Sequence, residues 1–327
     1  MSYKIGSFNI RDFKKGPSNI DGELVERDFK MIANIIISEE FDIVAIQEVN
    51  DKNALIRLKK ELNFRKNYFR EWEYDYSGKA GIATKDPEGY GFIWNTKRLR
   101  MLEFEDKNRE KFYRFAGAKS LLRLPYYGRF TARGMNGGSN FELRLVNVHI
   151  KDAKSEVDRI NEFNTLVKQV LPRICEWHSL PKNMEHMPAY TFMVGDYNLT
   201  LDKGDEVDIK ILPITQTSYT GKIREYRTVL TEKTSLKRPK EQETIKECYS
   251  ENYDHFTYDC MLDMKLGLMA SRIEPLSKYL KHEYTPSEKL KRYRNRVSDH
   301  VPIVMEMDLR KRREIVKKGE MLLCQKN

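Results

Sequence analysis

The sequence predicts an α/β fold, in which helices cover the faces of β-sheets. Short apolar runs bounded by polar turns alternate along the chain with stretches whose apolar residues recur at helical spacing. This alternation is typical of α/β proteins. With 40% hydrophobic and 11% aromatic residues, the chain can bury a sizeable core, and we find no internal repeat of fixed period.

Six runs have the composition of buried strands, and two longer stretches have the pattern of amphipathic helices. The first helix is expected at residues 26–38, where Phe29, Ile32, Ala33 and Ile36 recur at helical spacing. The second is expected at residues 155–174, with Ser155 as a plausible start. The six strands are expected at residues 3–9, 42–47, 91–94, 143–149, 190–194 and 301–307.

Length and composition limit the cellular setting. A chain of 327 residues forms one large domain or two small ones. Its four cysteines, at positions 175, 248, 260 and 324, have no CxxC spacing, which argues against a zinc module and a disulfide framework. No apolar run is long enough to span a bilayer, and the first residues have no signal-peptide core. We therefore expect a cytoplasmic protein.

The net charge of +10 is concentrated near the C-terminal end. Residues 285–296 contain five basic and one acidic side chain, and residues 310–327 contain seven basic and two acidic ones. Such stretches suit a nucleic acid or an anionic surface. The alternative is a solvated helix followed by a charged tail. We predict a domain at residues 1–309 with a surface insertion near 215–252, rich in Thr, Lys, Glu and Ser, and a basic tail at 310–327.

Polar side chains recur at the ends of the predicted strands, where α/β proteins bind ligands. Each has a plain structural alternative: Asp196 and Asn198 could form an Asx turn, and His149 could be a packed core histidine. Carboxylate and amide oxygens suit Mg²⁺ or Mn²⁺, whereas two histidines without cysteines make a weak zinc site. The sequence has no G-x-S-x-G elbow and no P-loop. The candidates are Asn9, Glu48, Glu88, His149, Asp196, Asn198, Asp254, Asp299 and His300.

These residues lie in motifs that resemble the endonuclease, exonuclease and phosphatase superfamily of metal-dependent phosphoesterases, in particular its pancreatic deoxyribonuclease branch. The motifs follow the family's order over nearly the whole chain. They are FNIRDF (8–13), DIVAIQEV (42–49), GYGFIW (89–94), VNVHI (146–150), GDYN (195–198), YDHF (253–256) and SDHVPI (298–303). The resemblance implies a four-layered α/β sandwich, with two packed mixed or antiparallel sheets flanked by helices.

The resemblance also implies roles. Glu48 would be the main metal carboxylate, helped by Asn9 and Asp299. Asp196 would position the attacking water, and Asn198 would hold a phosphate oxygen. His149 and His300 would share acid and base duties, oriented by Glu88 and Asp254 respectively. Arg11, in the FNIRDF motif, and Arg129, in YGRFTAR, are the expected substrate contacts, although Arg129 could equally be a solvated surface arginine.

From these roles we expect a Mg²⁺- or Mn²⁺-dependent endonuclease that hydrolyses DNA phosphodiester bonds. Inositol phosphates, phosphoinositides or sphingomyelin are alternative substrates, because the basic charge also suits anionic head groups. A catalytically silent nucleic-acid-binding scaffold is a further alternative. RNA, lesion and strand preferences, protein partners and oligomeric state are not indicated by any motif.

Overall fold

The computed structural model describes most of the predicted domain. The described residues are 2–65, 70–80, 88–102, 121–133, 141–150, 152, 155–176, 188–200, 202–203, 206–207, 214–217, 223–229, 232–238, 240–241, 244–262 and 266–309. The predicted basic tail at 310–327 and Cys324 lie outside these ranges.

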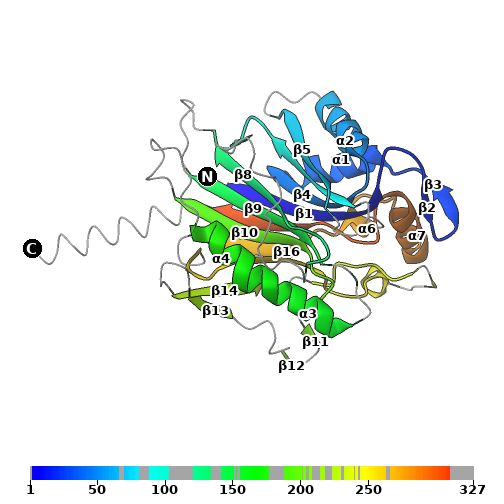
Figure 1. Ribbon diagram of the computed structural model, residues 1–327. Coiled ribbons are helices and arrows are strands. Elements are labelled where there is room, and N and C mark those ends of the chain that lie inside the picture. Colours follow the sequence, from blue (N-terminus) through cyan, green and yellow to red (C-terminus); the bar gives the residue numbers. More distant parts are fainter. Residues whose placement is uncertain are drawn as a thin grey trace, which may run out of the picture.

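Two large sheets form the centre of the fold (Figure 1). The first has the strand order β16-β17-β1-β4-β6-β5, in which β1 and β4 run parallel and the other neighbouring strands pair antiparallel. Its strands are β1 (Ser2–Phe13), β4 (Ile43–Val49), β5 (Trp72–Lys79), β6 (Gly89–Asn95), β16 (Gly267–Arg272) and β17 (Ile303–Asp308).

The second sheet has the order β13-β14-β15-β10-β9-β8-β7, in which β9 and β10 run parallel. Two small hairpins lie outside the large sheets: β2 (Ser18–Ile20) with β3 (Glu23–Val25), and β11 (Asp202–Lys203) with β12 (Glu206–Val207). The strands of the second sheet are β7 (Leu99–Met101), β8 (Tyr126–Ala132), β9 (Glu142–His149), β10 (Ala189–Asp196), β13 (Ile214–Thr217), β14 (Ile223–Val229) and β15 (Asp254–Asp259).

Three apolar clusters separate four layers, as the resemblance implied. The middle cluster packs the two sheets face to face. A second joins the outer face of the first sheet to α1, α2 and α7, and a third joins the second sheet to α3 and α4 (Figure 1). No described helix is long and apolar enough to cross a membrane. The helices are α1 (Phe29–Ser38), α2 (Lys52–Phe64), α3 (Glu156–Thr165), α4 (Leu171–Glu176), α6 (Pro275–Lys278) and α7 (Pro286–Arg296).

All six predicted strands and both predicted helices are present, with shifted ends. The first helix starts at Phe29 instead of residue 26, because the Asp28 side chain accepts a hydrogen bond from the Met31 N–H and caps the helix there. The second is interrupted by a π-helical turn at Leu166–Val170, between α3 and α4. Ser155 is its N-cap residue but makes no side-chain cap hydrogen bond.

The segment predicted as a surface insertion, residues 215–252, is partly built into the core, which corrects that prediction. Within it, β14 pairs with β15 and extends the second sheet, with Tyr226 buried. Further along, Leu236 and Tyr249 are buried in the cluster that includes α1 and α7. Polar composition did not reveal these contacts because the buried residues are few and widely spaced.

One polar bridge crosses the otherwise apolar space between the sheets. Gln47 of β4 donates a hydrogen bond from Nε2 to Oδ1 of Asn147 of β9, at 2.7 Å. Asn147 in turn donates to the backbone carbonyls of Ile46 and Gly91 in the first sheet, at 3.1 and 3.2 Å. Both side chains are fully buried. Their hydrogen bonds therefore fix the position of one sheet relative to the other.

Gly195 allows the last two residues of β10 to approach β9 closely. Its φ is +147°, and a Cβ added there would press on the carbonyl oxygen of Val148 at less than van der Waals distance. No side chain can occupy this position without moving the backbone. The glycine thus sets the position of Asp196.

We expect Gly195→Ala to lower the free energy of unfolding by ~3 kcal/mol or more, because backbone strain and overpacking add at one residue. Urea unfolding would measure the loss. Gly16→Ala is the matched control, since nothing lies within 4 Å of an added Cβ there and no positive φ is required. Equal stability of the two variants would contradict the assigned role of Gly195.

Candidate active site

The strand registers bring three predicted residues into one row across the second sheet. His149 ends β9 and Asp196 ends β10, and the two are paired in the parallel register. Asp196 is also paired with Asp254, the first residue of the antiparallel strand β15. Because the three positions occupy neighbouring strands at one edge, their side chains meet although they are far apart in sequence.

Two histidines flank the buried Asp196 carboxylate, and each has a carboxylate on its far side. Oδ2 of Asp196 lies 3.5 Å from Nε2 of His300 and 3.8 Å from Nε2 of His149. Nδ1 of His300 is hydrogen-bonded to Oδ2 of Asp254 at 2.8 Å. Nδ1 of His149 lies 3.1 Å from Oε2 of Glu88. The structure therefore places all five predicted catalytic residues together.

The pKa values of the two histidines are shifted in opposite directions. Burial tends to lower the pKa of His300, but the carboxylates of Asp254 and Asp196 outweigh it and raise that pKa well above its usual range. Burial lowers the pKa of His149, and the nearby Arg123 guanidinium lowers it further. Opposite shifts of this kind are the pattern that a general acid and a general base need.

Glu48 reaches the site through a break in the strand pattern. The register shifts on both sides of it, between Asn9 and Phe13 in β1 and between Ile46 and Val49 in β4. Glu48 itself has φ +58°, a left-handed value that is rare for a non-glycine residue. Its carboxylate accepts a hydrogen bond from the Asp12 N–H at 3.0 Å. Burial raises the pKa of Glu48, and the charges of Glu88 and Asp299 add to this effect despite His149.

Asn9 contributes a buried acceptor that a ligand could engage. Its Nδ2 donates to Oδ2 of Asp196 at 2.8 Å, which fixes the amide orientation. Its Oδ1 is buried and has no hydrogen-bond partner among the described residues. A buried acceptor without a partner is costly, and amide and carboxylate oxygens such as those of Asn9 and Glu48 are ligands that suit a hard divalent cation.

A second group, Asp196, Asp254 and His300, also has its ligand atoms within 4.8 Å of one another. These atoms already satisfy each other, since Asp254 is bound to one imidazole nitrogen and Asp196 faces the other. The oxygens of Asn9 and Glu48 are therefore the better fit for a metal.

Asp299 lies in a ring of four alternating charges next to this pair. It is 3.5 Å from Arg11 and 3.7 Å from Arg294, and both arginines also face Asp21 of the β2–β3 turn, at 3.4 and 3.8 Å. The predicted substrate residue Arg11 is thus at the site, with its charge shared between two carboxylates. Arg294, on α7, was not expected from the sequence.

Asn198 forms the Asx turn that was the structural alternative, and it lies at the site as well. Its N–H donates to Oδ1 of Asp196 at 2.8 Å, and its Nδ2 donates to the Ile150 carbonyl at 2.7 Å. Its φ is +48°. The turn engages Oδ1 of Asp196, and the other carboxylate oxygen, Oδ2, faces the two histidines.

Arg129 is not part of this cluster, which corrects its prediction as a substrate contact. It lies in the middle of β8, paired with Arg144 five residues before His149, and is 3% exposed. Its Nε donates to Oε1 of Glu142 at 2.6 Å. Its position inside the strand and its buried carboxylate partner explain why it cannot reach the strand end.

The arginine that does reach the site is Arg123, which sequence reasoning missed. Its Nη2 lies 2.9 Å from Oε2 of Glu88, and its Nη1 donates to the His149 carbonyl at 3.5 Å. It is 7% exposed. The only available signal was its place just before the strand that contains Arg129, and that signal does not distinguish it from other basic residues.

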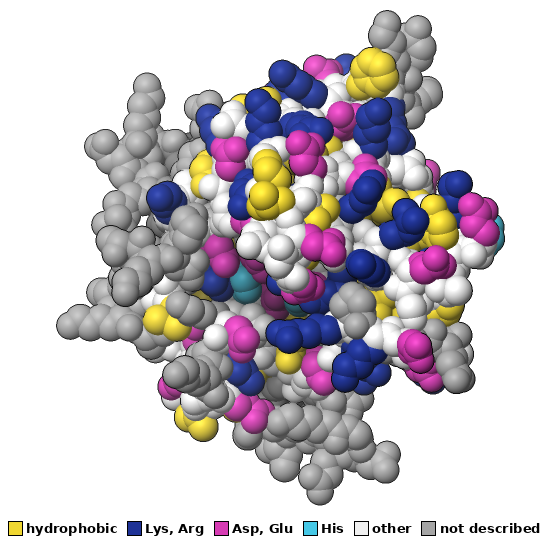
Figure 2. Space-filling model, turned by 90° about the vertical axis from the view of Figure 1, so that its right-hand side faces the viewer, with side chains coloured by type: hydrophobic (Ala, Val, Ile, Leu, Met, Phe, Trp, Pro, Cys, Tyr) yellow, Lys and Arg dark blue, Asp and Glu magenta, His cyan; other side chains and the backbone are white. Residues whose placement is uncertain are grey.

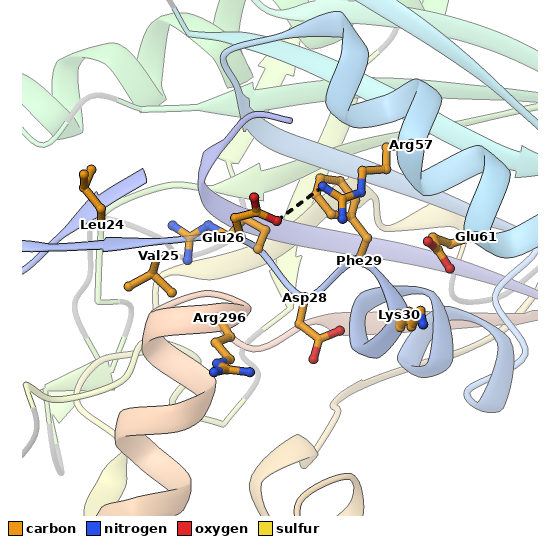
Figure 3. A pocket seen from close by; sticks show the side chains of 10 residues that line it. Leu24, Val25, Glu26, Asp28, Phe29, Lys30, Arg57, Glu61 and Arg296 are labelled. Atoms are coloured by element: carbon orange, nitrogen blue, oxygen red, sulfur yellow. Dashed lines mark ion pairs between the residues drawn. The ribbon is translucent and has the colours of Figure 1, made fainter. Parts of the chain in front are cut away.

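The site opens on one face of the molecule. Figure 2 shows histidine in a recess of this face, with acidic side chains beside it and lysines and arginines around it. A separate pocket of about 410 Å³ lies elsewhere on the molecule (Figure 3). It is lined by β3, the start of α1, two side chains of α2 and the end of α7. Its charges are of both signs, including an ion pair of Glu26 with Arg57 at 3.7 Å, and it contains no catalytic candidate.

We expect Asp254→Asn to shift the alkaline limb of the activity profile to lower pH by about one unit or more. Without the carboxylate, the imidazolium form of His300 is less stable, so its pKa falls and the proton donor is lost earlier as pH rises. Rates measured between pH 5 and 10 would test this. Asp158→Asn, on the exposed face of α3, is the control, and an unshifted limb in Asp254→Asn would contradict the assignment.

Known proteins resemble this chain weakly in sequence and over nearly its whole length in fold. No family model matches the chain. A curated deoxyribonuclease from a Thioalkalivibrio species is 26% identical over 196 residues, which are 60% of this chain; the chain spans about half the length of that relative, 46%.

Solved structures match over almost the whole chain. An endonuclease/exonuclease/phosphatase from Bacteroides vulgatus has 14% identity and a TM-score of 0.54, covering 94% of this chain and 99% of its own. A mannosyl-6-phosphatase from Bacteroides thetaiotaomicron has 17% identity and a TM-score of 0.55, covering 93% and 99%. D. rerio TDP2 complexed with a single-strand DNA product has 15% identity and a TM-score of 0.53, covering 94% and 99%. The chain therefore has the fold of the endonuclease/exonuclease/phosphatase superfamily, and the resemblance drawn from its motifs is confirmed at the level of the fold.

Proposed function

We propose that the chain is a divalent-metal-dependent phosphodiesterase that cleaves DNA within the strand. The observation that carries this proposal is the position of the Asp196 carboxylate, whose Oδ2 lies 3.8 Å from Nε2 of His149 and 3.5 Å from Nε2 of His300. Hydrolysis of a phosphodiester needs a positioned water, a base, an acid and positive charge at the phosphate oxygens. The site has a residue for each of these requirements.

The residues of this chain have separate roles in the proposed reaction. Asp196 positions the water for in-line attack on phosphorus, and the neutral His149 is placed to accept a proton from it. The protonated His300 is placed to deliver a proton to the leaving oxygen. Glu88 and Asp254 orient the two imidazoles, as a carboxylate does for histidine in other hydrolases. Asn198 and Arg123 flank the same space and are proposed to contact phosphate oxygens.

Asn9, Glu48 and Asp299 are the proposed ligands of Mg²⁺ or Mn²⁺. The unpartnered Oδ1 of Asn9 and the carboxylate of Glu48 are hard oxygen donors, and Asp299 acts electrostatically on Glu48. A divalent cation held there supplies positive charge to the phosphate oxygens. It also removes the penalty of keeping the Glu48 carboxylate ionised in a buried place.

DNA is the proposed substrate because the names of related proteins and the surface charge both point to it. A deoxyribonuclease is the sequence relative, and TDP2 was solved with a DNA product. In this chain, Arg292 and Arg296 are exposed on α7, which leads into Asp299 and His300. Such charges bind a phosphate backbone without reading its sequence. The mannosyl-6-phosphatase neighbour makes a sugar phosphate the main alternative substrate.

The decisive test is a cleavage panel of supercoiled DNA, linear DNA, RNA, inositol phosphate and mannose 6-phosphate, with Mg²⁺ and with chelator. We expect nicking of supercoiled DNA that stops with chelator. Asp196→Ala and His149→Ala should each lower the rate by about a hundredfold or more. Asp158→Asn is the control, because Asp158 is exposed on α3. Glu142→Gln would be unsuitable, because Glu142 is the buried ion-pair partner of Arg129 and Arg144. Turnover of mannose 6-phosphate without DNA cleavage would support the alternative instead.

Metal binding is tested without activity by titrating Mn²⁺ and following its bound fraction by electron paramagnetic resonance. We expect Glu48→Gln to weaken Mn²⁺ binding by tenfold or more, because it removes the charged ligand, and Asn9→Ala to weaken it less. If Asp254→Asn weakened binding and Glu48→Gln did not, the cation would belong to the Asp196, Asp254 and His300 group.

A further inference from the structure

A short segment of the predicted insertion, residues 234–238, lies directly beside the catalytic residues; we call it the wall segment. Ser235 forms an isolated β-bridge with His300. The Leu236 N–H donates to the Asp299 carbonyl at 2.7 Å, and the Val301 N–H donates to the Thr234 carbonyl at 2.9 Å. The wall segment thus runs along the chain that carries Asp299 and His300.

The wall segment is also anchored to the other side of the site. The hydroxyl oxygen of Thr234 accepts hydrogen bonds from the N–H groups of Tyr253 and Asp254, both at 3.1 Å. Thr234 is fully buried, and Leu236 is 4% exposed within the apolar cluster. The wall segment therefore contacts both the stretch that contains Asp254 and the stretch that contains His300. These contacts fix the position of the wall segment relative to the two residues.

The wall segment ends in two exposed cations, Lys237 and Arg238. In the part of the chain that the structure describes, neither has an ion-pair partner. The backbone of Lys237 is held, since its N–H donates to the Cys248 carbonyl at 2.9 Å. Burial lowers the pKa of Arg294, and the charge of Arg238 adds to this effect, so the two guanidinium groups lie within electrostatic reach of each other. An anion placed between them would relieve this repulsion.

Arg294 connects the wall segment to the proposed metal ligands. Its Nη1 donates to the Leu236 carbonyl at 2.7 Å, while its Nη2 lies 3.7 Å from Oδ2 of Asp299. The side chain is 7% exposed on the buried face of α7, so it supports the site without being available to a large ligand. Lys237 and Arg238 are the exposed basic groups of the wall segment that a large ligand can contact.

We propose that the wall segment is a binding surface for the strand next to the scissile phosphate, with Lys237 and Arg238 contacting its backbone phosphates. The inference rests on the proposed nuclease function. It identifies the part of the chain that would favour a polynucleotide over a phosphomonoester as substrate. A polynucleotide carries phosphates on both sides of the bond that is cut, whereas a phosphomonoester ends at the site. Binding of this kind is salt-sensitive and independent of base sequence.

The test measures binding apart from cleavage. A fluorescent DNA duplex is titrated in chelator at several salt concentrations, and the slope of log K against log salt is compared between the wild type and Lys237→Ala/Arg238→Ala. Each lost phosphate contact lowers the slope by about 1, so the double variant should lose about 2. Lys60→Ala/Lys168→Ala removes the same charge from exposed sites on α2 and on the π-helical turn, and should retain the wild-type slope. Thermal unfolding would confirm that both variants are folded.

The outcomes separate the two proposals. An equal slope in both double variants would overturn the role of the wall segment, even if the wild type cleaves DNA. Loss of slope together with no cleavage of DNA in Mg²⁺ would retain the wall segment as a DNA-binding surface and overturn the nuclease function. Binding of the wild type to phosphatidylserine vesicles but not to the duplex would overturn the wall segment's proposed partner.

Discussion

The buried carboxylate of Asp196 is the group on which the arrangement of the site depends. A carboxylate in a 1% exposed position must be compensated by hydrogen-bond donors and neighbouring charge. Asn9 supplies a donor from the first sheet, the Asn198 N–H supplies one from the turn, and Nε2 of His300 lies 3.5 Å from Oδ2. These groups come from strands of both sheets, so the sheets must be aligned for Asp196 to be stable. The proposed chemistry uses the same contacts.

Backbone conformations around the site are unusual in a consistent way. Three non-glycine residues there, Asp12, Glu48 and Asn198, have φ between +45° and +58°. Each such residue costs about 1 to 3 kcal/mol and persists only where its surroundings hold it. Hydrogen bonds do so here: Asp12 N–H binds the Glu48 carboxylate, and both groups of Asn198 are engaged. The strained turns aim carboxylate and amide oxygens out of the strands, which regular alternation would not do.

The sequence was sufficient for the fold class and for most of the site because both depend on local patterns. His149, Asp196 and His300 each stand at the end of an apolar run, and strand ends share an edge in sheets of this kind. Arg129 also lies in an apolar run, but it is paired with Arg144, five residues before the strand end at His149, and its partner Glu142 lies on another strand. Arg123, Arg294 and the wall segment depend on pairings between residues distant in sequence, which no periodicity encodes.

The hydrogen bond between Gln47 and Asn147 determines how accurately the first sheet, which carries Asn9, is positioned against the second sheet, which carries Asp196. Apolar surfaces packed against each other tolerate small lateral slips, since contact area changes little when they move. An amide pair tolerates almost none, because its bonds are directional and no water is there to replace them. Leucines in both places could hold the layers together equally well, but they would supply no directional contact to fix the position of Asn9 relative to Asp196.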